Sequence, residues 1–103
     1  MPVTVIEHWH LNEESSRNAF SVMQEMDDLV EDNAHAAPGW DGHARFFQLE
    51  DDTSHVLMIY NWGSKEEAEA MLESEKDLLA DFIRTRCTRD REIEFAEELP
   101  VDV

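Results

Sequence analysis

The sequence is poor in lysine and rich in acids, and this imbalance excludes two classes of partner. Only two lysines occur, Lys65 and Lys76, and eight basic residues stand against 25 acidic ones, which gives a net charge of −17. A surface of this sign repels the phosphates of nucleic acids and of anionic lipids, because binding to either depends on basic groups. We therefore expect neither a nucleic acid nor a membrane as a partner.

Cysteine, glycine, proline and long apolar runs are also scarce. Cys87 is the only cysteine, so a disulfide within the chain and a site with several thiolate ligands are both excluded. Three glycines and three prolines leave little room for linkers, and 103 residues suffice for one core. No apolar run approaches the ~20 residues of a membrane span, and the first residues lack the pattern of a signal peptide. The sequence thus predicts one cytoplasmic domain over residues 1–103.

Four segments have the composition and alternation of β-strands. They are rich in β-branched and aromatic side chains, and they cover residues 3–11, 43–49, 55–62 and 89–99. The second and third are joined by a short polar turn, which predicts a hairpin. The third is a nearly continuous apolar run, as in a central strand that is buried on both of its faces.

Two further segments have apolar residues at helical spacing. The first runs from Asn12, a favourable N-cap, to the helix-breaking Pro38, with Phe20 on its apolar stripe. The second begins at the capping residue Ser64 and should bend near Ser74. The resulting order predicts an α+β, ferredoxin-like βαββαβ fold with a four-stranded antiparallel sheet.

The predicted sheet has one face that the helices do not cover. Two helices cannot bury all of the apolar side chains of the sheet, which include Ile6, one of Phe46 and Phe47, much of residues 55–62, and Phe95. Pairing of two sheets face to face would bury the surplus and enclose a cavity in each half. We therefore expect a homodimer through the sheet faces, with room for a small organic ligand.

Histidines gather on one face of the first strand. His8 and His10 share that face, and His43 on the second strand would join them if its side chain points the same way. Such a group can act as a general base or bind a metal, although strand ends and dimer seams place polar residues similarly. Because their spacing is irregular and no carboxylate stands beside them, we predict no metal site. His8 is the candidate base.

Side chains at the end of the third strand complete the predicted site. Tyr60 and Asn61 alternate, so one of them should face a cavity and hydrogen-bond a phenol or quinone oxygen, unless backbone groups satisfy it instead. Trp62 could stack on a planar ligand or anchor the core where strand meets helix, and we favour the second role. Together with Ile6 and His8, these residues are expected to line the cavity.

Glu7, Trp9 and Trp40 are each predicted to have a structural role. Glu7 lies on an otherwise apolar strand face, which predicts either an ion pair with Arg45 or a point where that face reaches solvent. Trp9 is expected in the core. Trp40 lies in a turn, where it could close the cavity or the dimer edge.

Two stretches of the sequence resemble the antibiotic biosynthesis monooxygenase family. They are the apolar strand Val56–Trp62 with the helix start Ser64-Lys65-Glu66-Glu67-Ala68, and the link Ala37-Pro38-Gly39-Trp40-Asp41-Gly42. The resemblance extends over nearly the whole chain, with all six elements in order. It implies a homodimeric α+β barrel related to enzymes that oxidise polycyclic phenols with molecular oxygen, without metal or flavin. A planar or apolar substrate would be held in an apolar cavity and deprotonated there.

Two alternatives to that activity remain open. Some members of the family cleave haem, but the positions that match their asparagine, tryptophan and histidine are His8, Met71 and Asp81 here, and all three differ. An aspartate is a poor substitute for a haem-ligating histidine, so the resemblance implies no haem and no other cofactor. A non-catalytic homodimer that binds a small molecule, or is only structural, fits the sequence nearly as well, because a fold does not fix a function.

Overall fold

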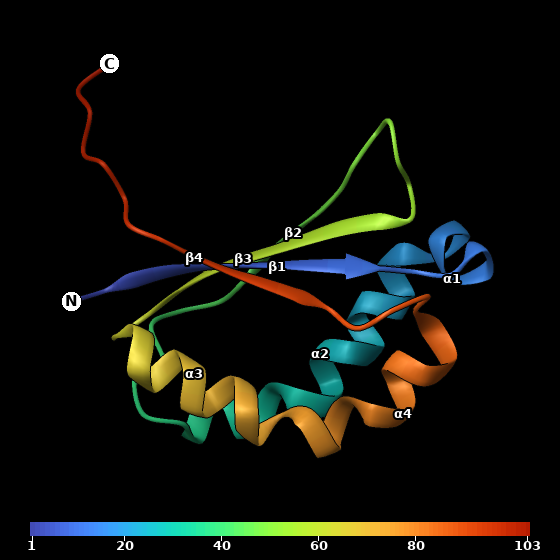
Figure 1. Ribbon diagram of the computed structural model, residues 1–103, viewed down its shortest axis with the longest axis horizontal. Coiled ribbons are helices and arrows are strands. Elements are labelled where there is room, and N and C mark those ends of the chain that lie inside the picture. The colour runs from blue at the N-terminus through green and yellow to red at the C-terminus, as the bar shows by residue number, and fades with distance from the viewer.

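One sheet of four antiparallel strands lies above a layer of helices in the computed structural model, which describes residues 1–103 (Figure 1). The strands are β1 (Val3–His10), β2 (Arg45–Gln48), β3 (His55–Trp62) and β4 (Glu92–Ala96). The helices are α1 (Glu13–Arg17), α2 (Ala19–Ala36), α3 (Lys65–Ser74) and α4 (Lys76–Arg86). The strand order is β2-β3-β1-β4, so the α+β, ferredoxin-like βαββαβ prediction is confirmed.

The strand register decides which residues face the helices. Val5 of β1 pairs with Tyr60 of β3 and with Phe95 of β4, so these three point to the same, helix-covered face. The covered face of the two central strands carries Val5, Glu7, Trp9, Val56, Met58, Tyr60 and Trp62. The open face carries Thr4, Ile6, His8, His10, His55, Leu57, Ile59 and Asn61.

Burial along β3 alternates, which corrects one expectation. Val56, Met58, Tyr60 and Trp62 are buried, whereas the residues between them are half-buried or exposed. The apolar composition of the strand predicted burial on both faces. Within this protomer the helices cover only one face, so the apolar residues of the other face remain accessible to water.

The helices bury apolar side chains against that covered face. Trp9 and Leu79 are fully buried, and the rings of Trp9 and Phe82 meet edge to face at 5.6 Å. Four α2 residues join the core: Val22, Met23, Met26 and Val30. Phe20 does not, because its side chain is 88% exposed. The predicted apolar stripe was therefore too wide at its start.

Both predicted helices are broken once. Asn12 caps α1 by accepting a hydrogen bond from the backbone N–H of Ser15 at 2.9 Å, as expected. Asn18 then leaves helical geometry, and its backbone N–H donates to the carbonyl of Ser15. Asparagine competes in this way with the regular helix pattern. The second break, at Glu75, lies next to the bend expected near Ser74.

A tight contact holds the link before β2 against the end of β3. Gly39 has φ +94°, and a Cβ there would lie 2.5 Å from Nε1 of Trp62, so only glycine fits. The Trp62 indole N–H donates to the carbonyl of Pro38 at 2.8 Å. Ser64 caps α3 by accepting from the N–H of Glu67, and its hydroxyl donates to Glu67 Oε1 at 3.1 Å, so the predicted N-cap is confirmed. These contacts give Trp62 the anchoring role that the sequence favoured.

The chain beyond β4 extends away from both layers (Figure 1). Leu99, Val101 and Val103 are exposed in this segment. None of the helices has the length and apolar character needed to cross a bilayer.

Replacement of the buried leucine of α4 should test this core. We expect Leu79→Ala to lower the free energy of unfolding by about 3 kcal/mol, because it leaves a cavity beneath the sheet. Leu78→Ala, at the neighbouring but largely exposed position, should cost well under ~1 kcal/mol. Urea unfolding followed by circular dichroism measures both. Equal losses would contradict the packing described.

Candidate functional site

A buried ionic cluster lies between the sheet and the helices. Glu7 points from β1 into this layer and is 1% exposed, Glu75 lies at the break between α3 and α4, and Arg91 precedes β4. The Arg91 Nη1 atom donates to Glu7 Oε1 at 2.9 Å and to Glu75 Oε1 at 3.0 Å. Glu7 therefore pairs with Arg91, and both interpretations offered for it, pairing with Arg45 and contact with solvent, were wrong. Arg45 lies on the open face, over the ring of Phe47.

Two further donors complete the environment of the Glu7 carboxylate. The Tyr60 hydroxyl donates to Oε2 at 2.5 Å, and the Trp9 indole N–H donates to Oε1 at 3.0 Å. The guanidinium of Arg91 also lies 5.5 Å from the centre of the Trp9 ring. A buried carboxylate needs several such partners, because its desolvation costs several kcal/mol.

The buried environment raises the pKa values of two residues in this cluster, Tyr60 and Glu75. Burial, followed by the nearby charge of Glu7, raises the pKa of Tyr60 far above its usual range, so its hydroxyl stays a donor. Burial also raises the pKa of Glu75 to about 7, against the opposing attraction of Arg91. A carboxyl group that titrates near neutral pH can accept or release a proton under physiological conditions.

Two neighbouring cavities lie beside this cluster. An inner pocket of about 70 Å³ reaches Glu7, Tyr60, Trp62 and Glu75. An outer groove of about 310 Å³ lies between α2 and the hairpin, and six of its nine lining residues are hydrophobic. The apolar side chains of the groove are Ala19, Phe20, Met23, Phe46, Phe47 and Val56. Asp27 lines both cavities, so the groove and the inner pocket are neighbours.

Aromatic and imidazole rings form the rim of the inner pocket. Trp40 lies edge to face against His35 at 5.0 Å and against His43 at 5.6 Å between ring centres. All three rings line the pocket. His43 therefore does not join His8 and His10, because the link that carries it runs beside α2 instead of over the open face.

The open-face histidines have a different third member and carboxylate partners. His8 Nδ1 lies 2.9 Å from His55 Nε2, and His10 Nε2 lies 2.6 Å from Glu92 Oε1. Glu94 pairs with His8. Both glutamates come from β4, a long-range pairing that the local sequence did not reveal. Burial lowers the pKa of His55, and the neighbouring His10 and His8 lower it further.

The five predicted site residues are divided between the two faces of the sheet. Ile6, His8 and Asn61 lie on the open face, where the Asn61 amide oxygen accepts from the Thr4 hydroxyl at 2.9 Å. Tyr60 and Trp62 lie on the covered face and line the inner pocket. Because successive strand residues point in opposite directions, the two sets do not line one cavity within a protomer.

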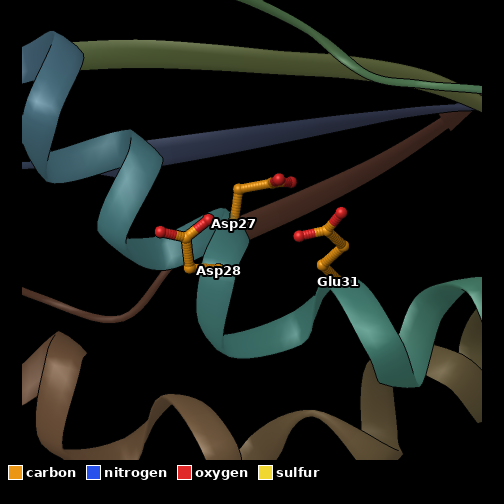
Figure 2. A group of neighbouring side chains, drawn as sticks. All are labelled: Asp27, Asp28 and Glu31. Atoms are coloured by element: carbon orange, nitrogen blue, oxygen red, sulfur yellow. The ribbon is translucent and has the colours of Figure 1, made fainter.

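Three acidic side chains crowd one turn of α2. Asp27, Asp28 and Glu31 place one carboxylate oxygen each within 4.8 Å of the others (Figure 2). Oxygen ligands of this kind suit hard cations, but Asp28 and Glu31 are exposed, as acidic groups without an ion commonly are. Asp27 and Glu31 also line the inner pocket, and their charges make its entrance acidic.

Solved structures of similar shape cover almost the whole chain. A monooxygenase from the gene ActVA-Orf6 of Streptomyces coelicolor, in complex with the ligand nanaomycin D, matches with a TM-score of 0.74 and 10% identity, over 98% of this chain and 90% of that one. An antibiotic biosynthesis monooxygenase matches with a TM-score of 0.66 and 17% identity, over 95% and 99%. Rv0793 from Mycobacterium tuberculosis matches with a TM-score of 0.64 and 14% identity, over 100% of both chains. This chain has the antibiotic biosynthesis monooxygenase fold.

The likeness to these proteins concerns the fold. Compared by sequence, the chain matches no protein-family model and no curated protein. The structural matches confirm, at the level of the fold, the resemblance inferred from the strand, cap and turn motifs. A shared antibiotic biosynthesis monooxygenase fold does not by itself define the reaction.

The positions compared with haem-cleaving enzymes do not form a haem site in this version of the fold. Met71 lines the inner pocket, whereas Asp81 is an exposed α4 residue paired with Arg84. His8 lies on the opposite face of the sheet. The three positions therefore do not converge within a protomer, and the position that matches the family's haem-ligating histidine is the exposed Asp81.

The raised pKa of Glu75 has a measurable effect on stability. Its folded pKa, about 7, exceeds the ordinary value of 4.5, so the folded state holds a proton that the unfolded chain has released. Its contribution is present below pH 4.5 and is lost as the pH rises to 7. Glu75→Gln removes this titration. Between pH 5 and 7, we expect the free energy of unfolding of the variant to rise relative to that of the wild type, by up to about 3 kcal/mol.

Urea titrations at several pH values measure that difference. Leu78→Ala introduces no titratable group and removes none, so its difference from the wild type should not depend on pH. A pH-independent difference for Glu75→Gln as well would show that Glu75 ionises normally.

Proposed function

We propose that this protein oxidises a small, largely planar phenolic substrate with molecular oxygen, using its own acid–base groups. The observation that supports this most is the position of Glu75. Burial raises the pKa of its carboxyl group to about 7, in a pocket that shares the lining residue Asp27 with an apolar groove. Buried groups with such shifted pKa values are concentrated at functional sites.

The sizes of the two cavities suggest how a substrate would lie. A cavity that holds benzene is about 150 Å³, so the inner pocket of about 70 Å³ is too small for a ring. The groove of about 310 Å³ is large enough, and Phe20 and Phe46 supply aromatic walls. The ring would therefore occupy the groove, and one polar substituent would enter the inner pocket.

The proposed chemistry needs a base more than it needs an oxidising cofactor. Removal of a proton from an electron-rich phenol or anthrone gives an anion that molecular oxygen can oxidise directly. For a ring methylene the balanced reaction is R₂CH₂ + O₂ → R₂C=O + H₂O. Glu75 would accept the proton, and Arg91 would stabilise the ionised carboxylate between proton transfers.

His8 remains a second candidate for the base. It lies on the open face with Ile6 and Asn61, so it would border a barrel interior only if two protomers pair through their sheets. A half-buried apolar stripe, made of Ile6, Leu57 and Ile59, supports such pairing. The homodimer is accordingly part of the proposal.

A non-catalytic dimer is the alternative function, and one observation favours it. Every charged group of the inner cluster already has a partner: Glu7 accepts from Arg91, Tyr60 and Trp9, and Glu75 accepts from Arg91. A fully satisfied buried network can be structural, because it fixes how the helices dock on the sheet.

Oxygen consumption distinguishes the two candidate bases. With 1,4-dihydroxynaphthalene or anthrone as substrate, we expect Glu75→Gln to lower kcat at least about 10²-fold, the usual contribution of a general base. His8→Ala should leave kcat within a few-fold of the wild type. The reverse result would move the site to the open face. No oxygen uptake across a panel of phenols and anthrones would favour the non-catalytic dimer.

The oligomeric state tests the sheet-face interface separately. Ile59→Glu places a charge in the middle of the open face, so we expect sedimentation velocity to change from a dimer to a monomer. Leu78→Glu introduces the same charge on the exposed side of α4 and should leave the dimer intact. A wild-type protein that sediments as a monomer would rule out the barrel.

A further inference from the structure

Both cavities lack lysine and arginine in their walls. Four carboxylates line the inner pocket, those of Glu7, Asp27, Glu31 and Glu75, and Asp27 also lines the groove. Arg91 lies behind this pocket and pairs with Glu7 and Glu75. Arg91 pairs with two of the four carboxylates, so Asp27 and Glu31 are left without a lysine or arginine partner in the pocket wall, where the only other ionisable bases are the imidazoles of His35 and His43.

Aromatic rings form much of the remaining wall. Trp40, Tyr60 and Trp62 line the same inner pocket as the carboxylates. The face of an aromatic ring attracts a cation, and the attraction grows when the pair is shielded from water. A confined space with indole and phenol walls and acidic side chains is chemically suited to an organic cation, and it disfavours a carboxylate or a phosphate.

Other hollows of the protein do not combine these features. The groove between α3, α4 and β4 includes Lys76 and Arg91, and the one beside α1 includes Arg86. The hollow between α2 and α3 has acidic residues but no aromatic ring. Acidic side chains and aromatic rings without a lysine or arginine thus occur together in the inner pocket and groove that the proposed function uses. The net charge of −17 would also steer a cation toward the protein.

We propose that the ligand of this site is an aromatic compound that carries a protonated amine. This inference rests on the proposed function for the location of the site and adds the charge of the molecule that binds there. The ring occupies the apolar groove, and the ammonium group lies beside Asp27, which lines both the groove and the inner pocket. Figure 2 shows the Asp27 side chain extending from α2 toward the strands.

The size of the inner pocket agrees with a head group of this kind. A space of about 70 Å³ accepts a small head group such as an ammonium and is too small for a ring. A ligand whose polar end is larger would have to displace the Trp40 rim. An uncharged alkyl end would fit, but it would leave Asp27 and Glu31 without a counter-charge.

Three phenols that differ mainly in charge test the inference by isothermal titration calorimetry. They are tyramine, 4-propylphenol and 3-(4-hydroxyphenyl)propionate, which are cationic, neutral and anionic at pH 7.5. We expect tyramine to bind the full-length protein at least about 10-fold more tightly than the neutral phenol, and the anion not to bind. Equal affinity for the cationic and neutral compounds would overturn the inference.

Matched variants locate the charge effect. Asp27→Asn should weaken tyramine binding about 10-fold and leave 4-propylphenol binding unchanged. Asp77→Asn removes the same charge from an exposed position on α4 and should change neither. Glu31→Gln is a second pocket variant in case Asp27→Asn does not fold. Loss of binding to the same extent in Asp77→Asn would show a general charge effect and overturn the assignment to this pocket.

The outcome separates this inference from the proposed reaction. Preferential binding of tyramine without oxygen uptake from any phenol would support the ligand class and reject the oxygenase activity. Turnover of neutral phenols, with no gain in kcat/KM for amine-bearing ones, would retain the activity and reject the ligand class.

Discussion

The guanidinium of Arg91 lies between two buried carboxylates that come from distant parts of the chain. Glu7 belongs to the central strand, and Glu75 lies where the second helical segment breaks, so one side chain connects sheet and helices. Removing one member of such a group leaves an uncompensated buried charge, which typically costs 3–5 kcal/mol, about as much as the largest core truncations. The geometry of the inner pocket depends on this connection, since Glu7 also orients Tyr60 and Trp9.

The same cluster relates stability to chemistry. The layer between sheet and helices is apolar enough to raise the pKa of Glu75 to about 7, yet Arg91 keeps its charged form accessible. Burial of Tyr60 keeps its hydroxyl protonated and donating. The packing that holds the helices in place thus also sets the protonation states inside the pocket. The two sheet faces differ in this respect: the histidines on the open face are paired with glutamates of β4 at the protein surface.

Much of the fold could be predicted from local patterns. The four strands, the hairpin, the caps at Asn12 and Ser64 and the break after Ser74 follow from alternation, turn residues and capping chemistry. The break at Asn18 was not predicted, because residues 13–18 have no apolar side chain from which a change of helical period could be read. Phe20 fits the helical period and is nevertheless exposed, because it lines the open groove between α2 and the hairpin and not the core.

The candidate site was harder to infer, and its residues show why. Tyr60 and Trp62 were recognised from the strand, but their partners were not. Glu75 and Arg91 resemble any other charged residues in a chain with 25 acids. One signal was present: Glu7 is an ionisable residue on an apolar strand face, and such a residue requires a buried partner of opposite charge. The sequence could not identify that partner, because Arg91 is 84 residues away.

The sequence by itself determined the alternation of strands and helices, the caps and the single negative sign of the surface, since these depend on neighbouring residues and on composition. Tertiary structure alone decided which face of each strand the helices cover, and therefore that Tyr60 and His8 lie on opposite sides of the sheet. It also decided which charges are buried together. The physical reason is that a strand register sorts residues by face, and long-range packing selects the register.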